Sequence, residues 1–135
     1  MTVSTLERLP LDSIDLLCKH LVVAAGDPYV LGEFEQVVLL AVLRLGDTAA
    51  YAVAIRSEIK DCTGRSVSRG SVYITLTRLE AKGYLRSWLA DPTPERGGRA
   101  KRYYALRTRA VNALRDSKEA LLALWRGLDG VLDRA

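Results

Sequence analysis

Apolar residues recur at helical spacing in two neighbouring segments of this chain of 135 residues. Residues 33–45, EFEQVVLLAVLRL, are apolar nearly all round, which is typical of a helix at the centre of a fold. Residues 50–61 predict a second helix, which Gly64 ends. The buried stripe of this second helix is expected to contain Tyr51, Ile55 and Ile59.

A third helix is predicted within residues 68–85, SRGSVYITLTRLEAKGYL, and its two faces differ in chemistry. Ser68 is a suitable N-cap, and Gly83 closes the helix. The core face consists of Val72, Leu76 and Leu79. The opposite face is basic, hydroxyl-rich and aromatic, and it carries Arg69, Ser71, Tyr73, Thr75, Thr77 and Arg78, with one acid, Glu80. A merely solvated face usually mixes both signs of charge, so this composition favours a negatively charged partner.

The period of the pattern changes after Gly83, from the helical spacing to strict alternation. Residues 84–90, YLRSWLA, and residues 102–107, RYYALR, both alternate apolar and polar positions, as β-strands do. The intervening DPTPERGGRAK holds two prolines and two glycines, which are typical of a loop. The two strands and their basic, Gly-rich loop therefore predict a hairpin.

The last segment, residues 108–134, predicts one long helix. Its apolar stripe follows a heptad spacing in which Lys118 is the polar interruption. The stripe consists of Val111, Leu114, Lys118, Leu121, Trp125, Leu128 and Leu132. A helix of about 25 residues spans nearly 40 Å and outreaches a core this small. The stripe therefore predicts a dimer seam, with an intramolecular core as the alternative.

The chain before the first central helix predicts an N-terminal extension, residues 1–28, that could hold an accessory helix. One face of that helix would consist of Leu11, Ile14, Leu17, Cys18, Leu21 and Val22. We expect the extension to be followed by a domain that holds the three helices and the hairpin, residues 29–107, and by the C-terminal helix with its predicted dimer seam, residues 108–135.

Composition fits one globular domain, with 49% hydrophobic residues and a net charge of +4. The distribution of charge is more informative than its sum. Residues 95–102, ERGGRAKR, hold four bases and one acid in the predicted hairpin loop. Such a local basic cluster is a plausible electrostatic footprint for phosphate.

Several function classes find no support in the sequence. Cys18 and Cys62 form no CxxC pair, and with His20 as the one histidine neither a zinc site nor a Ser-His-Asp site can be assembled. We expect two buried thiols, no catalytic site, no metal and no cofactor. No apolar run reaches the roughly eighteen residues that span a bilayer, and the first residues lack a secretory pattern. The expected location is the cytoplasm.

Three helices followed by a hairpin make a winged helix-turn-helix. The expected fold is thus mainly α with a small β-hairpin and a long C-terminal dimerisation helix. In this arrangement the third helix enters the DNA major groove with its N-terminal residues towards the base edges. Arginines and hydroxyls can bond to phosphates or bases there, and the helix N-terminus adds a partial positive charge.

Three motifs resemble the PadR family of bacterial transcriptional regulators: LGEFEQVVLLAVL, SRGSVYITLTRLEAKGYL and RGGRAKRYYALR. The resemblance covers about residues 31–132. It implies a homodimeric winged-helix protein that binds double-stranded DNA at a palindromic operator, acts as a repressor and dimerises through its C-terminal helix. Some members sense small aromatic or hydrophobic compounds, which implies an effector pocket between the dimer helix and the core, where Trp125 could lie.

The resemblance also implies which residues bind DNA. Ser68, Arg69, Ser71 and Tyr73 occupy the family's recognition-helix positions, and Arg99, Lys101 and Arg102 occupy the wing. Thr75, Arg78 and Arg96 complete the expected set. Many members have proline where this chain has Arg69, a difference that offers an additional phosphate contact.

Alternatives remain open for several of these residues. Tyr73 could be a packing aromatic, Arg78 could pair with Glu58 or Glu80, and the wing bases could belong to a solvated loop. The whole module could instead bind RNA or dock onto a protein, since RNA-binding sheets offer exposed aromatic rings. The hairpin provides Trp88, Tyr103 and Tyr104.

Overall fold

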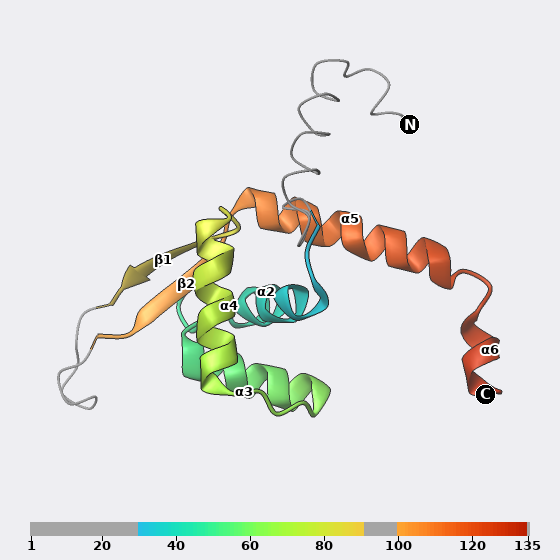
Figure 1. The fold of residues 1–135 in the computed structure, drawn as a ribbon, viewed down its shortest axis with the longest axis horizontal. Coiled ribbons are helices and arrows are strands. Elements are labelled where there is room, and N and C mark those ends of the chain that lie inside the picture. Colours follow the sequence, from blue (N-terminus) through green and yellow to red (C-terminus); the bar gives the residue numbers. More distant parts are fainter. Residues whose placement is uncertain (1–29, 91–99, 135) are drawn as a thin grey trace, which may run out of the picture. The chain divides into compact units, whose positions relative to one another are not determined.

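The computed structural model describes residues 30–90 and 100–134. The chain divides into two compact units, Met1–Leu31 and Gly32–Ala135. The elements of the second unit are α2 (Glu33–Leu45), α3 (Ala52–Thr63), α4 (Arg69–Ala81), β1 (Leu85–Leu89), β2 (Arg102–Leu106), α5 (Thr108–Trp125) and α6 (Asp129–Asp133) (Figure 1). The predicted extension, residues 1–28, with its accessory helix, Cys18 and His20, lies outside the described residues.

The structure confirms a mainly helical fold with a small hairpin. Its core is formed where α2, α3 and α4 meet, and the strands add Leu85 of β1 and Tyr104 of β2 to it. The largest fully buried side chains are Tyr84, Leu39, Ile55, Ile59, Leu76, Leu79, Leu85, Val38, Val42 and Val72. The apolar circumference of α2 is only partly covered, because Leu40 and Leu43 are 46% and 53% exposed.

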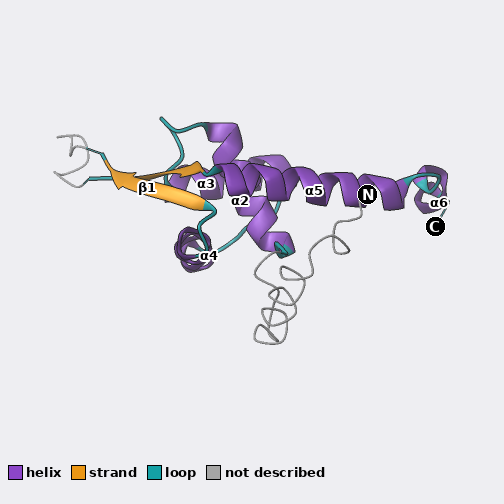
Figure 2. Ribbon diagram, turned by 90° about the horizontal axis from the view of Figure 1, so that it is seen from above, coloured by secondary structure: helices purple, strands orange, loops and turns teal. Residues whose placement is uncertain are grey.

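The predicted hairpin is confirmed. It is antiparallel, with Leu85 opposite Leu106 and Trp88 opposite Tyr103. It is attached to the start of α3 by backbone pairing. Tyr51 and Tyr103 form an antiparallel bridge, and the amide of Tyr104 donates to the carbonyl of Ala50 at 2.9 Å. Figure 2 shows the two strands beside α4. The wing is thereby fastened to both helices of the helix-turn-helix.

Helix α3 begins two residues later than the pattern predicted. Tyr51 is its N-cap, with extended backbone angles, and is half-buried, whereas Ile55 and Ile59 lie in the core as expected. The predicted end is confirmed. Gly64 takes a left-handed conformation, with φ of 74°, which glycine adopts without the steric cost of a Cβ atom.

Helix α2 is tied to α4 and to α5 by adjacent residues. Glu35 is buried, and its carboxylate accepts from Lys82 Nζ at 2.8 Å and from the Gly32 amide at 3.0 Å. Burial alone would raise the pKa of Glu35, but these two hydrogen bonds outweigh it, so the pKa lies below its ordinary value. The next residue, Gln36, accepts from Ser117 Oγ of α5 at 2.8 Å.

The prediction of one helix over residues 108–134 is wrong. Helix α5 ends at Trp125, and α6 follows after a short turn. Gly127 in this turn has φ of 82°, outside the helical region. A continuous helix is also disfavoured here, because a glycine within a helix lowers the stability of the helix by about 1 kcal/mol relative to alanine. Within α5, Ala110 and Leu114 are buried, whereas the residues from Lys118 onwards are exposed.

Candidate nucleic-acid interface

The first turn of α4 is capped by serine side chains. Ser68 Oγ accepts from the amide of Ser71 at 3.0 Å and donates to Ser71 Oγ at 2.8 Å, which confirms the predicted N-cap. The first turn holds no acidic residue. The positive end of the helix is therefore not neutralised by a carboxylate within this turn.

Most of the predicted surface of α4 is exposed. Arg69, Ser71 and Arg78 are exposed, and Tyr73 is 59% exposed, so its ring is not part of the core. Thr75 is only 4% exposed, so its predicted place on the outer face is wrong. Its position follows from helical geometry, because Thr75 lies between Val72 and Leu79 on the core stripe.

Ile74 was not predicted as a surface residue, yet it is 57% exposed and lies beside Tyr73 on α4. Its position off the stripe of Val72, Leu76 and Leu79 was the available signal. An exposed isoleucine on this face can make apolar contacts with the methyl group of thymine.

The start of α3 and the start of α4 enclose a cleft of about 280 Å³. Its lining consists of Ala52, Val53, Arg69, Gly70 and Tyr73. Arg69 and Tyr73 therefore face a shared space with the first turn of α3.

The alternative ion pairs of Arg78 do not form among the described residues. Glu58 instead accepts from Arg44 Nε at 2.7 Å, and Glu80 accepts from Ser87 Oγ at 2.7 Å. The charge of Arg78 contributes to the lowered pKa of Glu35. Arg78 thus keeps an exposed guanidinium on α4.

The inner face of the hairpin connects α4 with both strands through polar groups. Ser87 Oγ of β1 donates to Glu80 at 2.7 Å and accepts from Arg102 Nη1 of β2 at 2.9 Å. Arg102 is exposed but held by this contact. Tyr104 is buried on the same face, where burial raises the pKa of its phenol.

The outer face of the hairpin carries a row of three aromatic rings with a cation at each end. Trp88 stacks on Tyr103 at a centroid distance of 6.3 Å, and Tyr103 lies 5.6 Å from Tyr51. Arg86 lies 4.7 Å above the ring of Trp88, and Lys101 Nζ lies 3.8 Å above the ring of Tyr51. We call these five residues the aromatic row.

The predicted wing residues are only partly within the described chain. Arg96 and Arg99 lie outside the described residues, whereas Lys101 and Arg102 stand where β2 begins. These two side chains point to opposite faces of the hairpin, one to Tyr51 and the other to Ser87. The described base of the wing therefore presents a cation on each face.

The turn between α3 and α4 is held by bases of α3. Arg56 Nε donates to the carbonyl of Val67 at 2.7 Å, and Lys60 Nζ donates to Ser66 Oγ at 3.0 Å. Cys62, near the end of α3, is exposed, which corrects the expectation of a buried thiol. Its Sγ donates to Glu58, a contact that raises the pKa of the thiol.

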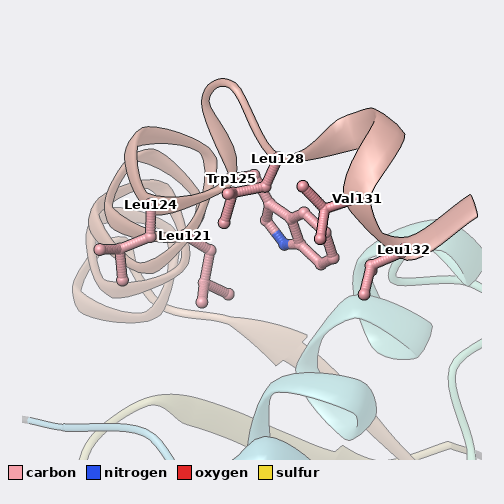
Figure 3. Close-up of a pocket in the computed structure, with 6 residues that line it drawn as sticks. All are labelled: Leu121, Leu124, Trp125, Leu128, Val131 and Leu132. Carbon is pink, nitrogen blue, oxygen red and sulfur yellow. The ribbon is translucent and has the colours of Figure 1, made fainter. Parts of the chain in front are cut away.

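The predicted seam residues form two adjoining apolar hollows. Between α2 and α5 lies a groove of about 510 Å³ lined by Gln36, Leu40, Leu43, Val111, Leu114, Arg115, Lys118, Leu121, Leu122 and Trp125. Around the turn between α5 and α6 lies a hollow of about 230 Å³ lined by Leu121, Leu124, Trp125, Leu128, Val131 and Leu132. Figure 3 shows the indole of Trp125 among the aliphatic side chains of the second hollow.

The break after Trp125 alters the geometry of the predicted seam. Leu128 and Leu132 do not continue the straight stripe of α5, because they belong to the turn and to α6. They contribute instead to the hollow around Trp125, whose described lining is entirely apolar. Leu121 and Trp125 line both hollows.

Two other kinds of site were sought in the described part of the chain. No group of three or more His, Cys, Asp or Glu side chains there is arranged to hold a metal ion. None of the described helices has the length and apolar character needed to span a bilayer.

The described chain forms a winged helix-turn-helix. It has three helices, of which α4 is capped and exposed, followed by a hairpin that pairs with the start of α3. The family model "Transcriptional regulator PadR-like family" matches residues 39–115, more than half of the chain. The chain belongs to this family of transcriptional regulators. No curated protein sequence matches it.

Solved structures show the same fold. A PadR family transcriptional regulator from Eggerthella lenta is 20% identical, with a TM-score of 0.58, over 92% of this chain and 99% of that one. A PadR family regulator from Clostridium difficile is 21% identical, with a TM-score of 0.53, over 75% and 96% of the two chains. The complex structure of hsRosR-SG is 26% identical, with a TM-score of 0.56, over 81% and 88%.

Proposed function

We propose that this PadR-type regulator is a homodimer that binds a palindromic operator in double-stranded DNA and represses transcription. It acts by binding and not by catalysis. Residues 29–107 form the DNA-binding domain, and residues 108–135 carry the dimer contacts. The observation that carries this proposal is the exposed, acid-free first turn of α4, with Arg69, Ser71 and Tyr73 around it.

In this function α4 is the recognition helix and lies in the major groove. Arg69 and Ser71 reach phosphates or base edges from its first turn, and the hydroxyl of Tyr73 binds a phosphate. Ile74, exposed beside Tyr73, supplies an apolar contact to a thymine methyl group. Ser68 orients the helix start through its cap, so its contribution is partly structural.

The wing binds the backbone of the duplex beside the recognition helix. Lys101 and Arg102 approach phosphates from the base of the wing, and Arg96 and Arg99 do so from its loop. Arg78 adds a further phosphate contact from the exposed side of α4. These contacts raise affinity for every duplex and make binding dependent on salt.

Dimerisation buries the apolar surface that α5, α6 and the exposed side of α2 leave open. Leu40, Leu43, Leu121 and Trp125 are between 43% and 53% exposed in the single chain. Contiguous apolar surface of this kind marks protein contacts. Lys118 lies within the groove wall and keeps its ammonium in water by extending along its aliphatic stem.

A small hydrophobic or aromatic effector would bind where the dimer helix meets the core. The groove between α2 and α5 has this position, with Trp125 at one end and Gln36 and Arg115 as polar groups in its wall. Its volume of about 510 Å³ falls in the range of small-molecule sites.

The test compares ligand classes directly. Labelled duplexes covering the DNA upstream of the protein's own gene are titrated against mixed-sequence DNA and against RNA of the same sequence, at several salt concentrations. We expect one upstream duplex containing a palindrome to bind at least about a thousandfold more tightly than mixed-sequence DNA. Preference for the RNA would favour the RNA-binding alternative, and binding to no nucleic acid would favour the protein-docking one.

A further inference from the structure

Tyr51 connects the start of α3 with the base of the wing. Its backbone is the N-cap of α3 and pairs with Tyr103 of β2. Its ring contacts the ring of Tyr103 at 5.6 Å on one side and lies beneath the ammonium of Lys101 at 3.8 Å. Backbone pairing and ring contact together fix the plane of the ring that Lys101 covers.

A lysine over a fixed aromatic face is restricted before it meets any ligand. The ring quadrupole attracts the ammonium, and the side chain would otherwise sample many rotamers. Lys101 is half-buried as a result, unlike the exposed Arg102 beside it. The contact therefore restricts the rotamers of Lys101 before any ligand binds.

The location of this lysine agrees with a contact to the DNA backbone. Ala52 and Val53, which follow Tyr51 directly, line the cleft that Arg69 and Tyr73 of α4 complete. The ammonium over Tyr51 thus lies close to the start of α3, next to the exposed start of the recognition helix.

We propose that Tyr51 is a positioning residue for DNA binding, whose ring face holds the Lys101 ammonium in place for a DNA phosphate. The inference rests on the proposed function. It adds to that function a residue that lies neither in the basic cluster of residues 95–102 nor on the exposed face of α4. The phenol hydroxyl has no part in it, because the contact is made by the ring face.

A double-mutant cycle tests the coupling. Affinities are measured for wild type, Tyr51→Leu, Lys101→Ala and the double variant, using a mixed-sequence DNA duplex of about two helical turns. We expect Tyr51→Leu to weaken binding about two- to fivefold. In the Lys101→Ala background the same change should have no further effect. Lys101→Ala should also flatten the log-log salt slope by about one unit per protomer in contact with the duplex, or about two units for the dimer. Tyr51→Leu should flatten it by less, because it leaves the charge in place.

Two further variants separate positioning from packing. Tyr51→Phe keeps the ring face and should bind as wild type does. Trp88→Leu removes the ring at the other end of the aromatic row and should leave the Tyr51–Lys101 coupling intact. The inference is overturned if Tyr51→Leu lowers the affinity for DNA equally in the wild-type and the Lys101→Ala backgrounds. It is also overturned if Tyr51→Phe lowers the affinity as much as Tyr51→Leu does.

A measurement on the free protein covers the case in which Tyr51→Leu does not fold. The ε-methylene protons of Lys101 should show an upfield ring-current shift in the NMR spectrum of wild type and of Tyr51→Phe. Random-coil chemical shifts for the ε-methylene protons of Lys101 would also overturn the inference. If wild type binds no duplex at all, the proposed function fails and the inference with it. If it binds without coupling, only the inference fails.

Discussion

The winged part of the chain, from α2 to β2, and its C-terminal part, α5 and α6, differ in how much of their apolar surface is covered. In the winged part the stripe residues of α3 and α4 are buried, namely Ile55, Ile59, Leu76 and Leu79, and several polar groups are fixed by internal bonds such as Glu35–Lys82 and Ser87–Glu80. In the C-terminal part the large apolar residues from Leu121 onwards are exposed. Leu40 and Leu43 of α2 are exposed as well, so the single chain leaves apolar surface open on both sides of the groove between α2 and α5.

Under the proposed function, the two parts have separate tasks. Recognition of DNA requires a rigid surface whose donors point outwards from fixed positions. Dimerisation requires apolar area that remains accessible until a second copy arrives. Substitutions should therefore act on one task at a time, and the predictions below test this separation.

The largest effect is expected from Leu121→Lys, which places a charge where both apolar hollows meet. We expect a monomer with a folded winged part, whose affinity for a palindromic duplex falls by about two to four orders of magnitude, while half-site binding changes little. Analytical ultracentrifugation and near-ultraviolet circular dichroism provide the measurements. Ala120→Lys adds the same charge one residue earlier, outside the lining of both hollows, and should remain a dimer. A dimeric Leu121→Lys protein would contradict the assignment of the seam.

The next effect concerns the exposed face of α4. Arg69→Ala should leave the fold intact and lower affinity, and if Arg69 contacts a base, discrimination at that base pair should fall by about 1–3 kcal/mol. Competition binding against operator variants measures this loss. Thr75→Val is the matched comparison on the buried face, and it should leave discrimination unchanged because Thr75 cannot reach DNA. Unaltered discrimination and affinity in Arg69→Ala would remove this residue from the interface.

The buried pair of Glu35 and Lys82 tests whether internal bonds keep the winged part rigid. Glu35→Gln should lower the free energy of unfolding at pH 7 by about 1–3 kcal/mol, because it weakens a charged hydrogen bond at a buried site. The folded-state pKa of Glu35 is depressed, so its contribution is present above the unfolded-state value near 4.5 and is lost as the pH falls through the folded-state pKa. Urea unfolding of both proteins should therefore show a difference that shrinks below about pH 4.5. A difference independent of pH would mean that the charge of Glu35 contributes nothing.

The smallest effect is expected at the wing. Arg99→Ala and Arg102→Ala should each weaken binding to all duplexes by similar factors. Each phosphate contact removed should flatten the salt dependence by about one unit of log-log slope, which is about two units for a dimer that loses the contact in both protomers. Binding isotherms at several salt concentrations check this. Arg102→Lys keeps the charge, so its slope should equal that of wild type. Unchanged slopes in both alanine variants would show that these bases are only solvated.

Local patterns in the sequence were enough to predict most of the winged part. The helical stripe, the serine cap and the two alternating segments each depend on near neighbours, and the structure has all three. The assignment of Thr75 was wrong because the core stripe of α4 is wider than the three residues used to define it. Ile74 was missed because the sequence interpretation of this face considered only polar, charged and aromatic residues, although its position off the core stripe was visible in the sequence.

Contacts between distant segments were not predictable in the same way. The bridge of Tyr51 to Tyr103 and the contact of Lys101 with Tyr51 depend on tertiary placement, so Tyr51 was predicted as a core residue of a helix. The heptad spacing of the last segment extended across Gly127, because a heptad pattern considers only the apolar positions. The conformation of that glycine decides where α5 ends.

The adjacent bonds of Glu35 and Gln36 have a mechanical consequence. One holds the end of α4 and the other holds the middle of α5, and only one peptide unit separates them. A shift of α5 along α2 that keeps the Ser117–Gln36 bond would therefore move the N-terminal turn of α2 and, with it, the carboxylate that holds Lys82. The two neighbouring residues thus give α2 a direct connection to both α5 and the end of α4.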